Sequence, residues 1–195
     1  MKPLLFFMLM LPCVAGFAQD TLTNDLDVDG AGDLVYYEPA TALVICRLSS
    51  QGFKVMQSSP MDYNEPNIGI RAARNGFEFF VDFMRSGYAA QFRYDKETKR
   101  MRLIGMKDYA FGNAVHSGSG SSSVNLLTGD YEGNWNDYDM ERDKLVGTPV
   151  KGKLQMDRIW LEDFDDKVYE QYAEKSAALY ERQKQAVRKR SKGAR

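Results

Sequence analysis

The chain is poor in residues that cross-link proteins or act as acid-base catalysts near neutral pH. Its 195 residues include two cysteines and a single histidine, His116. One histidine excludes a metal site built from several imidazoles and limits general acid-base catalysis near neutral pH. No hydrophobic run reaches the ~20 residues that a membrane-spanning helix needs, so we expect no transmembrane segment. The formal net charge of −1 gives no support to nucleic-acid binding.

The N-terminus is typical of an export signal, predicted to cover residues 1–18. Lys2 provides the positive start, and residues 4–14 form a short apolar run. Gly16 and Ala18 are the small residues expected before a cleavage point. We therefore expect cleavage near Ala18 and a mature protein that is periplasmic or secreted.

Cleavage would also decide the disulfide chemistry of the mature chain. Cys13 lies within the predicted signal, so Cys46 would be the only cysteine that remains. An intramolecular disulfide is then excluded even in an oxidising compartment. Stability must come from a hydrophobic core and from any bound metal.

The most distinctive segment has aspartates at alternate positions before a glycine turn. Loop positions 1, 3, 5 and 9 are Asp25, Asp27, Asp29 and Asp33, and position 6 is a glycine. Ca²⁺ binds about six to eight oxygen atoms, and this spacing directs several carboxylates toward one point. The carbonyl of Ala31 at position 7 supplies a further oxygen. The spacing predicts a structural Ca²⁺ site; the alternative is a solvated acidic turn without a specific ion.

The acidic segment differs from an EF-hand at its last ligand, because Tyr36 stands where an EF-hand has a bidentate glutamate. With Asp33 followed at once by an apolar run, residues 25–36 resemble the FG-GAP or VCBS calcium loop of secreted proteins, in which the loop leads into a strand. The resemblance implies the four aspartates as side-chain ligands. A single copy excludes a propeller, which repeats the unit in each blade.

A second resemblance concerns the order of several segments along the chain. These segments are the calcium-like loop and residues 43–48, 92–94, 102–105 and 123–129. Together they resemble an uncharacterised family of exported bacterial proteins. The resemblance implies a secreted, mostly β protein and no particular chemistry.

Residues 33–157 consist of short alternating runs separated by turn residues, which is typical of an antiparallel sheet. Asn75 and Gly76 favour the tight turn of a hairpin. In the strand that follows, aromatic and aliphatic residues alternate with Glu78 and Asp82, which predicts a sheet packed on a core from one side. The Gly- and Ser-rich residues 116–123 predict a flexible surface loop.

From about Asp163 the spacing of apolar residues becomes helical, with Asp163 as the predicted N-cap. The apolar stripe consists of Phe164, Val168, Tyr172 and Leu179. The predicted fold is therefore mainly β (α+β), an antiparallel meander sheet or flattened barrel with one long C-terminal α-helix. Residues 19–161 are expected to form the calcium-type loop and sheet, and residues 162–195 the helix and a fraying basic tail of the same domain.

The candidate catalytic groups are few. The serine-rich segment beside His116 lacks the Gly-x-Ser-x-Gly spacing of a nucleophile elbow, and Cys46 lies in an apolar run where a thiol is expected to be buried. We expect no catalytic residues and predict a non-enzymatic binding module, whose partner is another protein or a cell-envelope component. One alternative is an inhibitor or immunity-type protein that caps an enzyme through an acidic edge at residues 137–143 or the serine-rich loop. Another is a hydrolase that uses Glu78 and Asp82, or the His116 loop.

Overall fold

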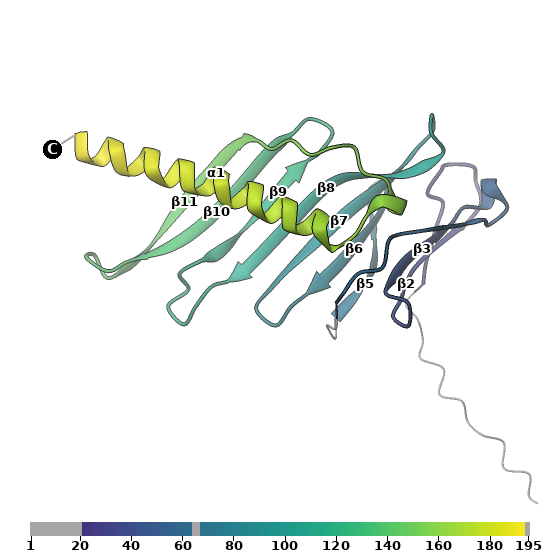
Figure 1. The fold of residues 1–195 in the computed structure, drawn as a ribbon, viewed down its shortest axis with the longest axis horizontal. Coiled ribbons are helices and arrows are strands. Elements are labelled where there is room, and N and C mark those ends of the chain that lie inside the picture. The colour runs from purple at the N-terminus through teal and green to yellow at the C-terminus, as the bar shows by residue number, and fades with distance from the viewer. Residues whose placement is uncertain (1–20, 64–66, 194–195) are drawn as a thin grey trace, which may run out of the picture.

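The computed structural model describes residues 21–63 and 67–193. Two antiparallel sheets and a long C-terminal helix make up this part of the chain (Figure 1). The predicted mainly β fold is confirmed. Each sheet is open within the described residues, so the meander is observed and the flattened barrel is not. The predicted export signal lies outside the described residues.

The smaller sheet has four strands in the order β1-β2-β3-β4. Its elements are β1 Leu22–Asn24, β2 Asp33–Glu38, β3 Leu43–Arg47, the short 3₁₀ helix η1 Ser49–Gln51, and β4 Val55–Gln57. The aspartate-rich loop connects β1 to β2, and β2 begins at the last aspartate of that loop. Alternate residues of β2 are buried, including Val35 and Tyr37. This alternation is what a strand with one face on a core requires.

The larger sheet is a seven-stranded meander in which each strand pairs with the next one along the chain. Its strands are β5 Asn67–Ala73, β6 Gly76–Asp82, β7 Ser86–Asp95, β8 Arg100–Phe111, β9 Ser119–Asn125, β10 Asp130–Asp139 and β11 Lys144–Lys153. The predicted hairpin at Asn75 and Gly76 is confirmed: it joins β5 to β6, with Asn75 at φ 61°. Phe77, Phe79 and Val81 are fully buried on one face of β6, also as predicted.

The serine-rich segment is a strand, so the predicted flexible loop at residues 116–123 is wrong for most of its length. Strand β9 begins at Ser119 and pairs with β8 on one side and β10 on the other. Backbone hydrogen bonds to two neighbouring strands hold these residues, although Ser and Gly have a low preference for strands.

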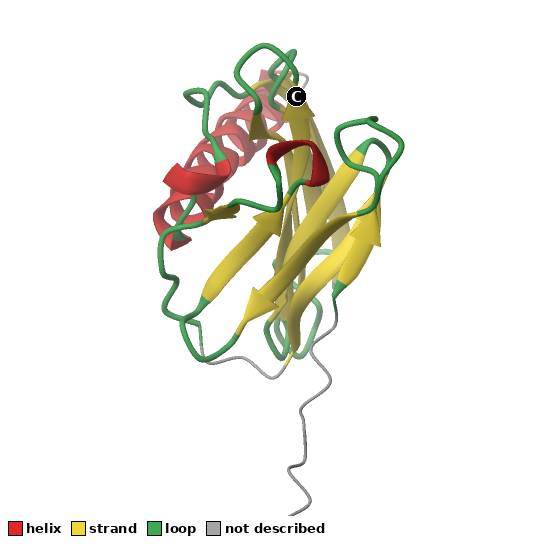
Figure 2. Cartoon of the chain, turned by 90° about the vertical axis from the view of Figure 1, so that its right-hand side faces the viewer, coloured by secondary structure: helices red, strands yellow, loops and turns green. Residues whose placement is uncertain are grey.

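The helix α1, Asp166–Gly193, lies along one face of the larger sheet (Figures 1 and 2). The predicted N-cap at Asp163 is wrong, because residues Leu161–Asp163 form a 3₁₀ helix, η2. Phe164 then adopts an extended backbone and is fully buried, with its ring centroid 5.1 Å from that of Phe92. Because this ring is buried by an extended backbone, the helix begins only at Asp166. The helix α1 continues to Gly193, and fraying of the basic tail stays a prediction.

The first turns of α1 and the segment before them cover an aromatic core, here called the aromatic half of the interface. Its members are Phe79, Tyr88 and Phe92 on the sheet, Phe164, and Tyr169 on α1. The rings of Tyr88 and Tyr169 stack with centroids 4.1 Å apart, and Phe164 meets Phe79 edge to face at 6.0 Å. Tyr37 of the smaller sheet reaches Phe79 at 5.7 Å, so the two sheets share this core. None of the described helices is long and apolar enough to cross a membrane.

Candidate metal loop and neighbouring pockets

The structure brings three of the predicted calcium ligands together in the loop between β1 and β2. One carboxylate oxygen from each of Asp25, Asp27 and Asp29 lies within 4.8 Å of the other two. Asp25 and Asp29 are exposed, whereas only 7% of Asp27 is exposed. The cluster is therefore open to solvent on one side and closed by Asp27 on the other.

Hydrogen bonds within the loop hold these carboxylates in place. Asp25 accepts the backbone N–H groups of Asp29 at 3.1 Å and Gly30 at 3.0 Å. Asp29 accepts the N–H of Ala31 at 2.7 Å. Val28 has φ 64°, a conformation that is strained for a β-branched residue, and Gly30 follows at φ 91°. This strained backbone conformation turns the side chains of Asp25, Asp27 and Asp29 toward one another.

Asp27 is the unusual member of the cluster. Its Oδ2 accepts a hydrogen bond from the hydroxyl of Ser50. Its Oδ1 is buried and has no hydrogen-bond partner within the described part of the chain. Leaving a buried acceptor unsatisfied costs about 1–3 kcal/mol, and more for a charged group. A cation bound between the three carboxylates would satisfy this oxygen.

Asp33 lies apart from the three-carboxylate cluster and anchors the loop. It is fully buried, and its Oδ2 accepts the N–H of Leu26 at 2.7 Å. Its Oδ1 accepts both the N–H and the hydroxyl of Ser49, at 2.8 Å and 2.9 Å. The corresponding EF-hand position often contacts the ion through water. Spacing alone misses Ser49 and Ser50, since the pairing of β2 with β3 brings them to the loop.

The proposed carboxylate pair Glu78 and Asp82 lies on the outer face of β6, away from α1, and both residues are engaged. Glu78 bonds Arg71 at 2.8 Å and Lys107 at 2.9 Å. Burial alone would raise the pKa of Glu78, but these two cations outweigh it and lower the pKa. Asp82 accepts hydrogen bonds from Asn67 at 2.6 Å and from the hydroxyl of Tyr109 at 2.9 Å.

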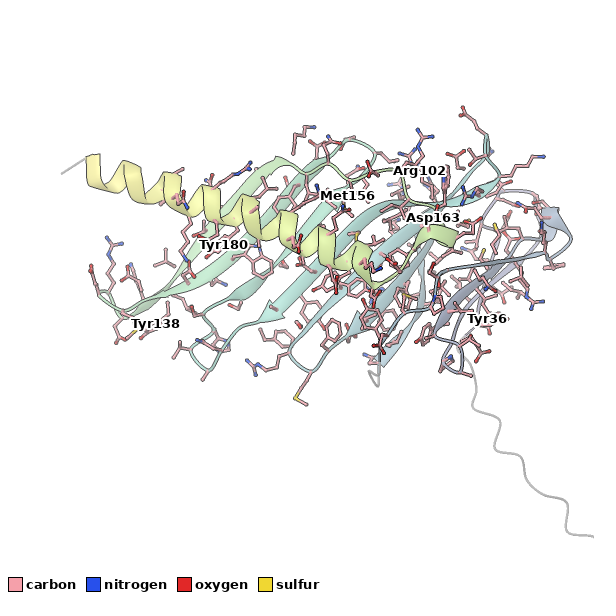
Figure 3. All side chains as sticks on the ribbon, in the orientation of Figure 1. Tyr36, Arg102, Tyr138, Met156, Asp163 and Tyr180 are labelled. Carbon is pink, nitrogen blue, oxygen red and sulfur yellow. The ribbon has the colours of Figure 1, made fainter. Side chains whose placement is uncertain are left out.

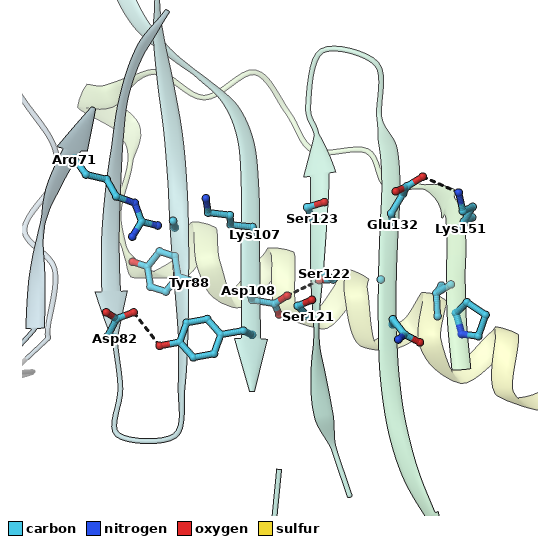
Figure 4. Close-up of a pocket in the computed structure, with 16 residues that line it drawn as sticks. Arg71, Asp82, Tyr88, Lys107, Asp108, Ser121, Ser122, Ser123, Glu132 and Lys151 are labelled. Atoms are coloured by element: carbon cyan, nitrogen blue, oxygen red, sulfur yellow. Dashed lines mark hydrogen bonds and ion pairs between the residues drawn. The ribbon is translucent and has the colours of Figure 1, made fainter. Parts of the chain in front are cut away.

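Arg71, Asp82, Lys107 and Tyr109 line one side of an open hollow of about 550 Å³ on the outer face of the larger sheet (Figure 4). Ser121 and Ser123 of β9 line its centre, and their short side chains leave the space. On the far side Lys151 pairs with Glu132 at 2.9 Å. The charged side chains around the hollow are of both signs, and its lining also includes apolar surface.

The remaining candidate residues are separated by the fold. His116 lies in the turn before β9, at φ 58°. Cys46 is fully buried as predicted, and burial raises the pKa of its thiol. The acidic residues 137–143 do not form one edge: Asp137 faces α1, whereas the Asp139 side chain caps the β10–β11 turn by accepting a backbone N–H at 3.0 Å. The predicted edge assumed that one strand continues through residue 143, but β10 ends at Asp139.

Beyond the aromatic half, α1 covers hydroxyl and carboxylate groups, here called the polar half of the interface. Its members are Asp108, Ser122 and Tyr131 on the sheet and Tyr172 and Ser176 on α1. Ser122 donates to Asp108 and lies 2.7 Å from the Tyr172 hydroxyl and 3.3 Å from that of Ser176. The Tyr131 hydroxyl lies 2.6 Å from Ser176. In the sequence, Ser176 lies four residues after Tyr172, within the apolar stripe of the helix. A polar residue on that buried face is the feature that could have indicated the network.

No protein-family model, curated protein or solved structure matches this chain. The resemblance of residues 25–36 to an FG-GAP loop therefore stays a prediction. Function has to be inferred from the geometry of the described residues.

Proposed function

We propose that the protein is an exported, non-enzymatic binding module whose loop at residues 25–33 holds a structural Ca²⁺ ion. The observation that carries the metal site is the buried, unpartnered Oδ1 of Asp27 within a cluster of three carboxylates. Oxygen ligands in a flexible loop suit a hard cation such as Ca²⁺. In this proposal Asp25, Asp27 and Asp29 bind the ion, and the predicted carbonyl of Ala31 completes the protein ligands.

The ion would act on stability rather than on chemistry. Three carboxylates close together repel one another, and a divalent cation converts that repulsion into attraction. The loop is tied to η1 through Ser49 and Ser50, so the bound ion would brace the smaller sheet where β2 begins and β3 ends. Asp33 keeps its anchoring hydrogen bonds in this arrangement.

Two recesses support the binding role. One is the open hollow on the outer face of the larger sheet, and the other is a smaller pocket beneath α1. The groups around the hollow are held in ion pairs and hydrogen bonds, an arrangement that suits recognition. The partner we propose is another protein or a cell-envelope component, in keeping with the predicted export signal.

Thermal unfolding of the mature protein tests the metal site. An ion that binds only the folded state adds RT ln(1 + [L]/Kd), about 1.4 kcal/mol at roughly ten times Kd. We expect millimolar Ca²⁺ to raise the Tm above its value in EDTA, and Mg²⁺ to raise it less. Asp27→Asn should abolish the response, whereas Asp157→Asn, at an exposed position outside the loop, should keep it. Identical melts in Ca²⁺ and EDTA would contradict the proposal.

A further inference from the structure

The middle of α1 leaves a pocket of about 250 Å³ above strands β8 and β10 and the turn before β9. Small residues of α1, including Ala173, face the sheet here and leave the space open. Asp108, Trp135 and Asp137 enter the pocket from the sheet, and Tyr180 points toward the sheet from α1 (Figure 3). The pocket is therefore lined by two carboxylates and two aromatic rings among mostly apolar walls.

One end of this pocket already binds an ammonium group, which belongs to the chain itself. The Nζ atom of Lys184 lies 2.8 Å from Asp137 Oδ2. The same atom lies 5.3 Å from the centroid of the Tyr180 ring, within the range of a cation–π interaction. A carboxylate and an aromatic ring thus recognise an ammonium group at the mouth of the pocket.

The other carboxylate of the pocket, Asp108, has no cation beside it among the described residues. In the described part of the chain it makes no ion pair, and its hydrogen-bond partners are hydroxyl and backbone groups such as Ser122. Burial raises the pKa of Asp108, and the hydroxyls of Ser122 and Tyr172 offset part of that rise. A half-buried carboxylate without a counter-ion is costly, because burial weakens its hydration.

We propose that the pocket binds a small organic ammonium ion, whose charge pairs with Asp108 and whose apolar body lies against Trp135. The volume corresponds to roughly eight water molecules at ~30 Å³ each, which suits a short alkyl amine and is less than a drug-sized ligand fills. This inference names a ligand class for the binding module proposed above. It requires the folded larger sheet and α1, and it does not require calcium at the loop.

An NMR titration of the mature, isotopically labelled protein tests the inference with three probes of equal chain length. The probes are n-butylammonium, neutral n-butanol and anionic butyrate, each added in Ca²⁺ and again in EDTA. We expect saturable shifts at the pocket for n-butylammonium only. Equal shifts from n-butanol would overturn the proposal, since binding would then be hydrophobic rather than charge-directed.

Three variants locate the binding. Asp108→Asn keeps the shape and removes the charge, and we expect it to weaken n-butylammonium binding about tenfold or more. Ala173→Leu keeps Asp108 and fills the pocket, so it should abolish the shifts. Asp157→Asn removes an exposed carboxylate that lines neither the pocket nor the outer hollow, and it should leave the affinity unchanged.

The outcomes separate this inference from the calcium proposal. Binding that persists in both Asp108→Asn and Ala173→Leu would place the amine elsewhere and overturn the inference. Absence of saturable shifts in the folded wild-type protein would overturn it as well. Neither result bears on the rise in Tm that calcium is expected to cause. If calcium does not raise the Tm, the titration in EDTA still tests the amine pocket.

Discussion

The two halves of the interface between α1 and the larger sheet hold the helix by different means. In the aromatic half, Phe164 packs against Phe79 and Phe92, and the interior there is filled by rings. In the polar half, a chain of hydroxyl groups ends at Asp108, and a pocket of about 250 Å³ remains. The first half has the close packing of an ordinary core, whereas the second keeps a carboxylate and open space under a helix.

The difference indicates that one part of the α1 interface stabilises the fold and another part leaves room for a ligand. Large buried side chains contribute about 1.5–3 kcal/mol each when they leave water, so the aromatic half holds α1 on the sheet. That stability allows the polar half to retain a carboxylate that does not favour folding. Recognition sites commonly break the packing rules that the rest of a fold obeys.

The largest expected effect comes from breaking the aromatic half. Phe164→Ala should lower the free energy of unfolding by about 3–5 kcal/mol, because it leaves a cavity between two other rings. Urea denaturation measures the loss. The matched control is Phe111→Ala, at a ring that is 54% exposed, which should change stability by no more than about 0.5 kcal/mol. A similar loss in both variants would show that the aromatic half is not the main support of α1.

An intermediate effect is expected from breaking the polar half. Ser122→Ala removes the hydroxyl shared by Asp108, Tyr172 and Ser176, and should cost about 1–3 kcal/mol. Ser121 is the adjacent residue on the same strand and faces the outer hollow, so Ser121→Ala should be close to neutral. Chemical denaturation of both variants compares the two faces of β9 directly. Equal effects would mean that the hydroxyl network adds nothing to stability.

The smallest expected effect is a gain in stability, from Asp108→Asn. Burial raises the pKa of Asp108 in the folded protein, so the folded state binds a proton more tightly than the unfolded state does. Stability contributed by this group therefore falls as pH rises from the unfolded value, about 3.9, through the higher folded value. Asparagine removes this penalty, so the variant should have the higher Tm at pH 7.

The advantage of Asp108→Asn should shrink as pH falls through the folded pKa of Asp108 and disappear below the unfolded pKa. Melting curves of both proteins across this range, at constant ionic strength, give the comparison. A variant that is less stable than wild type at pH 7 would show that the ionised carboxylate is well compensated. Asp108 would then stabilise the fold rather than reduce its stability.

Much of the larger sheet could be predicted from short-range pattern. Asn75 and Gly76 specify their turn through backbone conformation, and the alternation in residues 77–83 specifies which face is buried. Residues 119–123 could not be assigned in this way, because their strand depends on backbone pairing with β8 and β10 and not on side-chain preference. The start of α1 was misplaced for a related reason, since burial of Phe164 decides the conformation there.

The sequence by itself determined what neighbouring residues can decide, namely the turn of the acidic loop, the alternation of the strands and the helical stripe. Tertiary structure alone decided which distant groups meet. It brings Ser50 to Asp27, and it places Ser122 of a strand against Ser176 of the helix. The physical reason is that such contacts depend on strand register and on packing of the helix, which no local spacing encodes. The unpartnered oxygen of Asp27 and the pocket at Asp108 therefore emerge only once the chain is folded.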